Sequence, residues 1–212
     1  MNTRVHSRKP PRWLTAVAVS AALVTLAAGC GTRTGDSGAG SGTRGGDTGT
    51  SGALPEGWGT LRTPTVTVAH PPAFTPQSAA DRSKYNAAAA TLAEEGKDGK
   101  DGKGGKNVGM ITVQLGFTNA GTAEEAAIGA EAGIALGSTL KRQTKIEVNA
   151  PGGRAEARRV DFEFTEKGSR VEGVIVAGID TAEKAYAVRI DAVKGKLSDG
   201  DLRRILDSIT LK

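Results

Sequence analysis

A β-hairpin is encoded in Ala157-Arg-Arg-Val-Asp-Phe-Glu-Phe-Thr165, the pair Lys167-Gly168, and Arg170-Val-Glu-Gly-Val-Ile-Val-Ala-Gly-Ile179. In the first segment Val160, Phe162 and Phe164 alternate with charged residues, which places them on one face of a strand. The Lys-Gly pair supplies the turn, and the apolar content of the last segment is typical of a central strand. An antiparallel sheet is therefore the expected centre of the fold.

Five other segments carry strand signals of the same kind. They cover residues 63–70, 86–95, 108–117, 144–149 and 186–193. The second is ambiguous, because its run of four alanines favours a helix on propensity alone. We favour a strand there, since it would form a hairpin with the clear strand at 108–117. Residues 73–85 are expected to be a polar connection, and Pro151-Gly152 fits the centre of a type II turn.

Two helices are marked by their N-terminal caps. Thr122 and Glu125 form a capping box for a helix that is expected to run to about Leu136. Ser198 and Asp201 form the corresponding pair at the last helix. Its apolar residues follow at the spacing of one buried face: Leu202, Ile205, Leu206 and Ile209. Hairpin-linked strands and two separated helices indicate an α+β fold, with an antiparallel sheet covered by helices.

The charge of the chain is unevenly distributed. Its 212 residues include 28 Lys and Arg against 23 Asp and Glu, a formal net charge of +5. Four of the basic residues precede position 13, and without them the balance is 24 against 23. A nucleic-acid-binding domain would need a basic face of its own. The composition therefore argues against a nucleic-acid partner.

The N-terminus has the three parts of an export signal. A basic stretch from Arg4 to Arg12 precedes an apolar run from Trp13 to Ala28, and Gly29-Cys30 follows. The 16 residues of the apolar run are too few to span a bilayer comfortably, which takes about 20. This order predicts a secretory signal peptide at residues 1–29, with its basic end on the cytoplasmic side.

The end of this signal, Leu26-Ala-Ala-Gly-Cys30, resembles the bacterial lipobox, although Ala27 stands where leucine is usual. Cys30 is the one cysteine of the chain and has no partner for an intramolecular disulfide. The resemblance implies cleavage between Gly29 and Cys30 and a diacylglyceryl group on the Cys30 thiol. Two acyl chains hold a protein at a membrane where one holds it only marginally. The expected location is the extracytoplasmic face of the cell membrane. An incidental cysteine behind an ordinary signal peptide is the alternative.

Residues 30–57 are rich in Gly, Ser and Thr and have almost no apolar side chain before Leu54. Such a stretch cannot bury enough surface to offset its backbone entropy, which predicts a flexible tether. The remaining residues, 58–212, have the usual size of one domain. The expected organisation is a lipidated cysteine, a tether and a single α+β domain.

Residues suited to catalysis or metal binding are scarce after the signal. His70 is the one histidine there, expected at a strand end near the surface, and no Gly-x-Ser-x-Gly elbow accompanies it. Zinc sites need more His and Cys ligands than the chain supplies. The paired carboxylates Glu94-Glu95 and Glu124-Glu125 are explained by a strand and a helix start. We therefore predict no catalytic residues, metal ligands or cofactor.

The Lys/Gly-rich segment 96–106 lies between the two strands of one expected hairpin. Its lysines recur at every third position: Lys97, Lys100, Lys103 and Lys106. It encodes neither a phosphate loop nor an EF-hand, because the Gly-x-x-x-x-Gly-Lys spacing and the alternating acidic ligands are missing. We expect a solvated hairpin tip. Contact with anionic headgroups or wall polymers is the functional alternative.

Four features follow one another through the domain. They are Val66-Thr-Val-Ala-His-Pro71, Ala150-Pro-Gly-Gly-Arg-Ala155 leading into Arg159-Val-Asp-Phe-Glu-Phe164, the hairpin from Val171 to Val193, and Leu206-Asp-Ser-Ile-Thr-Leu211. In order and spacing they resemble the LpqN-like lipoproteins of actinobacteria, within the broader PsbP/Mog fold, over roughly residues 60–212. The resemblance implies an antiparallel sheet of about six strands sandwiched by helices. It also implies a non-catalytic accessory or binding role.

Three functions are compatible with these features. The first is a membrane-anchored binding or accessory module of the bacterial cell envelope, whose partner is an envelope protein or an amphiphile. The second is a lipid-carrying transport accessory, which requires an apolar pocket between sheet and helix. The third is a carboxylate-based envelope hydrolase, which requires a cleft lined by convergent Asp or Glu side chains with raised pKa values.

Overall fold

The computed structural model describes residues 54–94, 105–134 and 136–212. The chain divides into two units, Met1–Gly46 and Asp47–Lys212, and every described residue belongs to the second. The predicted signal peptide, the lipidated Cys30 and nearly all of the tether lie outside the described residues, as does most of the Lys/Gly-rich segment. Within the described ranges, no helix is long and apolar enough to cross a membrane.

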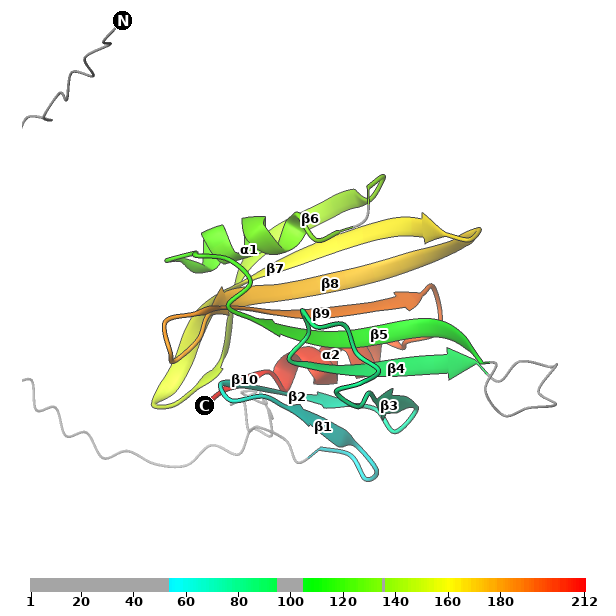
Figure 1. Ribbon diagram of the computed structural model, residues 1–212, viewed down its shortest axis with the longest axis horizontal. Coiled ribbons are helices and arrows are strands. Elements are labelled where there is room, and N and C mark those ends of the chain that lie inside the picture. Colours follow the sequence, from blue (N-terminus) through cyan, green and yellow to red (C-terminus); the bar gives the residue numbers. More distant parts are fainter. Residues whose placement is uncertain (1–53, 95–104, 135) are drawn as a thin grey trace, which may run out of the picture. The chain divides into compact units, whose positions relative to one another are not determined.

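One sheet of ten strands forms the centre of the described part (Figure 1). In chain order the strands are β1 (Gly59–Arg62), β2 (Val66–His70), β3 (Phe74–Pro76), β4 (Ala88–Glu94), β5 (Lys106–Leu115), β6 (Thr139–Ala150), β7 (Gly153–Glu166), β8 (Ser169–Ile179), β9 (Ala185–Val193) and β10 (Thr210–Leu211). Across the sheet their order is β1-β2-β10-β6-β7-β8-β9-β5-β4-β3. The sheet curls until β1, near one end, contacts β4, near the other.

This architecture corrects the predicted fold class. The described residues form ten curled strands accompanied by two helices of nine residues each, α1 (Ala123–Glu131) and α2 (Asp199–Asp207). An α+β fold with about six strands sandwiched by helices is therefore the wrong description. The physical reason is the sheet itself, which covers much of its own inner face by curling, so that one short helix on each face suffices.

The central hairpin lies where the sequence pattern predicted it. β7 and β8 pair antiparallel, with Val160 opposite Ile175. Lys167 and Gly168 connect them with φ angles of 47° and 77°, the two positive values that a type I′ turn requires. The ambiguous segment at 86–95 is also a strand, since β4 pairs antiparallel with β5. Both predictions are confirmed.

The two faces of the sheet carry separate cores. The inner, concave face and α2 contribute one set of buried side chains, which includes Val174, Val176, Val188, Ile190 and Ile205. The outer face and α1 contribute another, which includes Ala126, Ala127, Val160, Phe162 and Ile175. Neighbouring residues of a strand point to opposite faces, so β8 contributes to both cores. Each helix thus covers one face.

Both helices begin at their predicted caps. The Thr122 hydroxyl accepts a hydrogen bond from the Glu125 N–H at 3.2 Å, and the Ser198 hydroxyl accepts one from the Asp201 N–H at 3.0 Å. The first helix ends at Glu131, earlier than predicted. The predicted helix contains Gly129 and Gly133, and Gly133 follows the last turn of the observed helix. Glycine has a low helix propensity, which favours this earlier end.

Candidate binding site

The second helix, α2, leaves a cavity on each side of its N-terminal half. Its position is fixed by Ile205, which is fully buried in the inner core. Asp199 and Leu202 line both cavities, so the two spaces flank the first turns of the same helix. We call the cavity toward β7, β8 and β9 the inner groove, and the cavity toward β6 the edge cavity.

The inner groove has a volume of about 340 Å³ and an apolar floor. The apolar side chains come from β8, β9, the following loop and α2: Val174, Ile190, Ala192, Leu197 and Leu202. Val174 and Ile190 also belong to the inner core, so the floor of the groove is continuous with that core. Small-molecule sites in proteins commonly have volumes of about 300–1,000 Å³. The groove lies at the lower end of this range.

Charged side chains form the rim of the inner groove and pair with one another. The Glu163 carboxylate lies 2.5 Å from Lys141 Nζ. Asp161 is contacted by both Arg142 and Arg159, at 3.2 and 2.6 Å. The hydrogen bond from Lys141 is the main reason why the pKa of Glu163 is lowered. Exposed ion pairs of this kind contribute little to stability one by one, so the rim serves chiefly as a polar entrance.

The edge cavity has a volume of about 370 Å³. It lies between α2 and the consecutive residues Ile146, Glu147, Val148 and Asn149 of β6. Leu202 and Leu206 of α2 supply apolar lining, and the charged lining consists of three arginines and three acidic residues: Arg154, Arg159, Arg203, Glu147, Asp199 and Asp207. This cavity is therefore more mixed in character than the inner groove.

His70 is buried at the end of β2, which corrects the expectation that it lies near the surface. Its side chain is 4% exposed, and Nδ1 lies 3.0 Å from the carbonyl oxygen of Pro71. Gly59 of β1 packs against the ring, where a Cβ atom would come 2.3 Å from Nε2. Because β1 was not predicted, the strand that covers His70 was missing from the sequence-based expectation. The buried His70 ring therefore packs against β1 and has a structural role in the β1–β2 hairpin.

The paired carboxylates are dispersed over the described surface. Glu124 lies 3.1 Å from an Arg158 nitrogen, and Glu125 accepts a hydrogen bond at the start of α1. Glu94 forms an ion pair with a lysine, and Glu95 lies outside the described residues. None of the three described carboxylates lines the inner groove.

Asp191 is the carboxyl group of the described residues whose pKa is clearly raised, and burial is the main cause. Arg189, at 2.6 Å, partly offsets this shift. The Arg189 guanidinium also lies 5.1 Å from the centre of the Phe162 ring and donates to the Gly133 carbonyl. Asp191 does not line the inner groove. The raised pKa therefore belongs to a structural cluster near α1.

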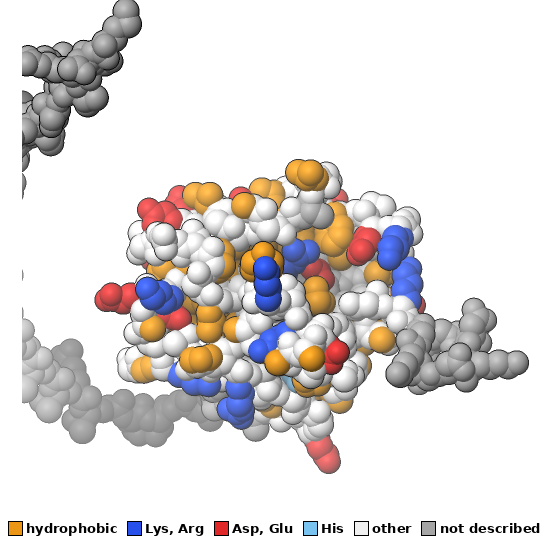
Figure 2. Space-filling model, viewed as in Figure 1, with side chains coloured by type: hydrophobic (Ala, Val, Ile, Leu, Met, Phe, Trp, Pro, Cys, Tyr) orange, Lys and Arg blue, Asp and Glu red, His pale blue; other side chains and the backbone are white. Residues whose placement is uncertain are grey.

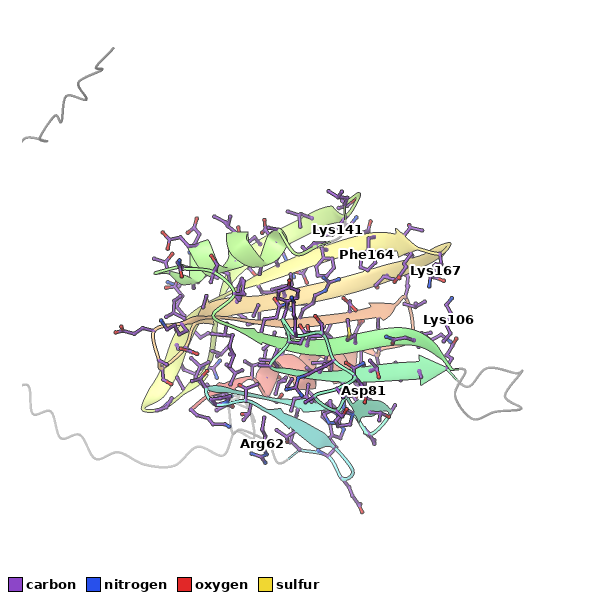
Figure 3. The ribbon with its side chains drawn as sticks, in the orientation of Figure 1. Arg62, Asp81, Lys106, Lys141, Phe164 and Lys167 are labelled. Carbon is purple, nitrogen blue, oxygen red and sulfur yellow. The ribbon has the colours of Figure 1, made fainter. Side chains whose placement is uncertain are left out.

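Lys106 is the one lysine of the predicted tip that the structure describes. Its Nζ lies 3.4 Å from Ser169 Oγ, close to the turn between β7 and β8. Figure 3 shows Lys106 and Lys167 at the same end of the sheet. Together with Glu166 they line a smaller cavity of about 260 Å³. The other lysines of the tip lie outside the described residues.

The surface gives no sign of a single charged interface in the view of Figure 2. There, among the described residues, Lys and Arg side chains are interspersed with Asp and Glu. The described residues also contain no group of three or more His, Cys, Asp or Glu side chains arranged to hold a metal ion. The two cavities beside α2 are therefore the strongest candidates for a binding site.

Sequence reasoning missed the inner groove, although it assigned most of the surrounding elements correctly. Arg159, Asp161 and Glu163 were assigned to a charged strand face without a specific role, but that face is the inner one and borders the groove. A usable signal was the pair of apolar residues Leu197 and Leu202, which flank the predicted cap of the last helix. Both also mark where α2 meets the sheet.

Comparisons with known proteins identify partly similar structures but no family. No protein-family model matches the chain, and no curated protein matches it significantly. LpqN of Mycobacterium tuberculosis, a protein involved in cell envelope biogenesis, is similar in structure at 10% identity and a TM-score of 0.46, over 73% of this chain and 90% of LpqN. A Bacteroides thetaiotaomicron VPI-5482 protein is similar at 10% identity and a TM-score of 0.38, over 69% of this chain. The matched region spans 45% of that protein, less than half of its length.

Proposed function

We propose that the protein is a lipoprotein anchored through Cys30 to the extracytoplasmic face of a bacterial cell membrane, with a domain that acts as a non-catalytic binding module. The observation that carries the binding function is the inner groove, a cavity of about 340 Å³ with an apolar floor and a rim of paired charges. An amphiphile suits this combination, because its chain would contact the floor while its polar end stays at the rim.

The energetics favour a chain-like ligand over a fully polar one. Each methylene buried against the apolar lining contributes about 0.8 kcal/mol, so a short segment of chain gives measurable affinity. A polar ligand would instead have to displace ion pairs that already satisfy the rim carboxylates, such as Glu163 with Lys141. A role as a lipid-carrying transport accessory is the specific form of this function that the groove supports best.

The hydrolase alternative has less support. Four carboxylates line the inner groove. Three of them are paired with a basic side chain, namely Asp161, Glu163 and Glu172, and the fourth, Asp199, lies in the first turn of α2. A general acid of a glycosidase needs a raised pKa, whereas the pKa of Glu163 is lowered. The carboxyl group with a raised pKa, Asp191, does not line the groove.

Metabolic labelling with radioactive palmitate tests the anchor. We expect the full-length protein, expressed in a bacterial host, to incorporate the label and to sediment with membranes. Cys30→Ala should lose both properties, because the thiol that would carry the diacylglyceryl group is gone. An unlabelled wild-type protein would contradict the proposed lipid anchor but would not bear on the proposed binding of an amphiphile in the inner groove.

Binding of dansyl-labelled undecanoic acid tests the groove. We expect saturable binding, with an increase in dansyl fluorescence as the probe leaves water. Leu202→Gln should weaken binding by about tenfold, because it replaces apolar lining with an amide that the chain cannot satisfy.

Arg204→Gln is the matched control, since it places the same side chain on the exposed face of the same helix. Its affinity should equal that of the wild type. Non-saturable binding, or equal affinities of wild type and Leu202→Gln, would exclude the inner groove as the amphiphile site.

A further inference from the structure

Strand β6 has an open edge along most of its length. On one side it pairs with β7 from Thr139 to Ala150. On the other side, among the described residues, it pairs with β10 through Asn149 alone. A β-bulge between Leu140 and Arg142 interrupts the strand near its start. The regular part of the open edge therefore runs from residue 143 to residue 148.

The backbone groups at this edge point away from β7. The Asn149 N–H donates to the Ile209 carbonyl on the β10 side. Backbone N–H and C=O groups of alternate residues point the same way in an antiparallel strand, so those of Gln143, Lys145 and Glu147 face the same open side. The Glu147 carbonyl accepts a hydrogen bond from the Arg154 side chain at 3.0 Å. Within the described part of the chain no strand pairs with the remaining groups, which leaves them available to an added strand.

The edge cavity lies beside these groups. Its lining includes four consecutive residues of β6, Ile146 to Asn149. Consecutive side chains point to opposite faces, so a space that touches all four reaches the edge of the strand. Its contact with Arg159 of β7 shows that it also extends over the inner face of the sheet. Leu202, Leu206 and Arg203 of α2 form its other wall. The result is a slot of about 370 Å³ between a strand edge and a helix.

We propose that this slot binds an extended segment of a partner polypeptide, which adds to the sheet as a strand beside residues 143–148. Main-chain hydrogen bonds to Gln143, to Lys145 and to the N–H of Glu147 would supply affinity, as in other cases of strand addition. Alternate apolar side chains of the peptide would enter the cavity between Ile146 and Leu206. This site is distinct from the inner groove and adds a protein partner to the proposed amphiphile ligand.

The geometry favours a single peptide strand over a second copy of the chain. In a symmetric β6–β6 pair, the α2 helices of both copies would lie on the same face close to the symmetry axis. Arg203 and Asp207 of α2 already line the space beside the β6 edge. A pair centred on Lys145 would also set two lysines directly opposite each other, which is unfavourable. A lone extended segment meets neither obstacle.

Selection from a phage-displayed library of random dodecapeptides on the immobilised full-length protein tests this site. We expect enriched peptides with apolar residues at alternate positions. Lys145→Pro should weaken the binding of the enriched peptides by at least about tenfold, because proline removes an edge N–H and its ring obstructs the incoming strand. Proline is tolerated at strand edges when its missing donor faces outward. Lys145→Ala, which keeps the N–H, is the matched control and should bind as the wild type does.

Backbone N-methylation of an enriched peptide gives a second measurement that does not depend on the variant folding. Methylation of the amides that face β6 should abolish binding, and methylation of the alternate amides should be tolerated. No enrichment, or equal tolerance of methylation in both registers, would overturn the proposal. So would sedimentation velocity that shows a wild-type dimer disrupted by Lys145→Pro, since the occupant would then be a second copy.

Discussion

Replacing Gly173 with valine is expected to destabilise the protein by about 3 kcal/mol. Gly173 of β8 lies directly opposite Phe162 of β7, and the Phe162 ring occupies the space where a side chain would stand. A Cβ atom on Gly173 would come 2.3 Å from Phe162 Cζ. The ring has little room to move, because it is 2% exposed and lies beneath the Arg189 guanidinium. Urea unfolding followed by circular dichroism would show the loss as a lower midpoint.

A double-mutant cycle separates this clash from a general intolerance of valine at position 173. Phe162→Ala alone should cost about 3–5 kcal/mol, as expected for a buried phenylalanine. In that background Gly173→Val should cost less than about 1 kcal/mol, because the atoms it would strike are gone. If the two substitutions lowered the free energy of unfolding additively, the Phe162 ring would not be what limits the size of residue 173.

Alternation predicted the strands that are long enough to show it. β7 has 14 residues, which gives several repeats of the apolar–polar pattern, and the 11 residues of β8 were predicted from their apolar content instead. β3 and β10 have 3 and 2 residues, too few for any pattern. They are strands because of their partners, with Phe74 opposite Leu92 and Thr210 opposite Thr67. The number of strands, and with it the curl of the sheet, was therefore underestimated.

The inner groove escaped prediction for a different reason. Alternation shows that Arg159, Asp161 and Glu163 share a face, but not whether that face meets solvent or another part of the chain. The answer depends on the curl of the sheet and on where α2 crosses it, both of which involve residues far apart in sequence. The caps of α2 were predictable because Ser198 and Asp201 are local partners. The cavities beside that helix are not a local property.

Ile205→Ala is expected to destabilise the protein by about 3 kcal/mol, since comparable deletions of buried isoleucine cost about 2–5 kcal/mol. Ile205 is fully buried in the inner core and is the residue through which α2 is held in place. Inner-core residues come from strands on both sides of the curl, such as Val66 of β2 and Val188 of β9. The cavity left by alanine therefore cannot be closed by the movement of one strand alone. Thermal and urea unfolding would both measure the loss.

Arg203→Ala is the matched control on the same helix, because Arg203 is exposed, and its substitution should change stability by no more than about 0.5 kcal/mol. The two variants also test how α2 supports the binding site. Leu202 borders both cavities. Because Ile205→Ala should loosen the helix that carries Leu202, this variant should bind dansyl-labelled undecanoic acid more weakly than the wild type. The affinity of Arg203→Ala for the probe should equal that of the wild type. If Ile205→Ala cost less than about 1 kcal/mol and bound the probe normally, α2 would have to be held by its two ends. The N-terminal cap at Ser198 and the pairing of β10 with β2 would then carry its position.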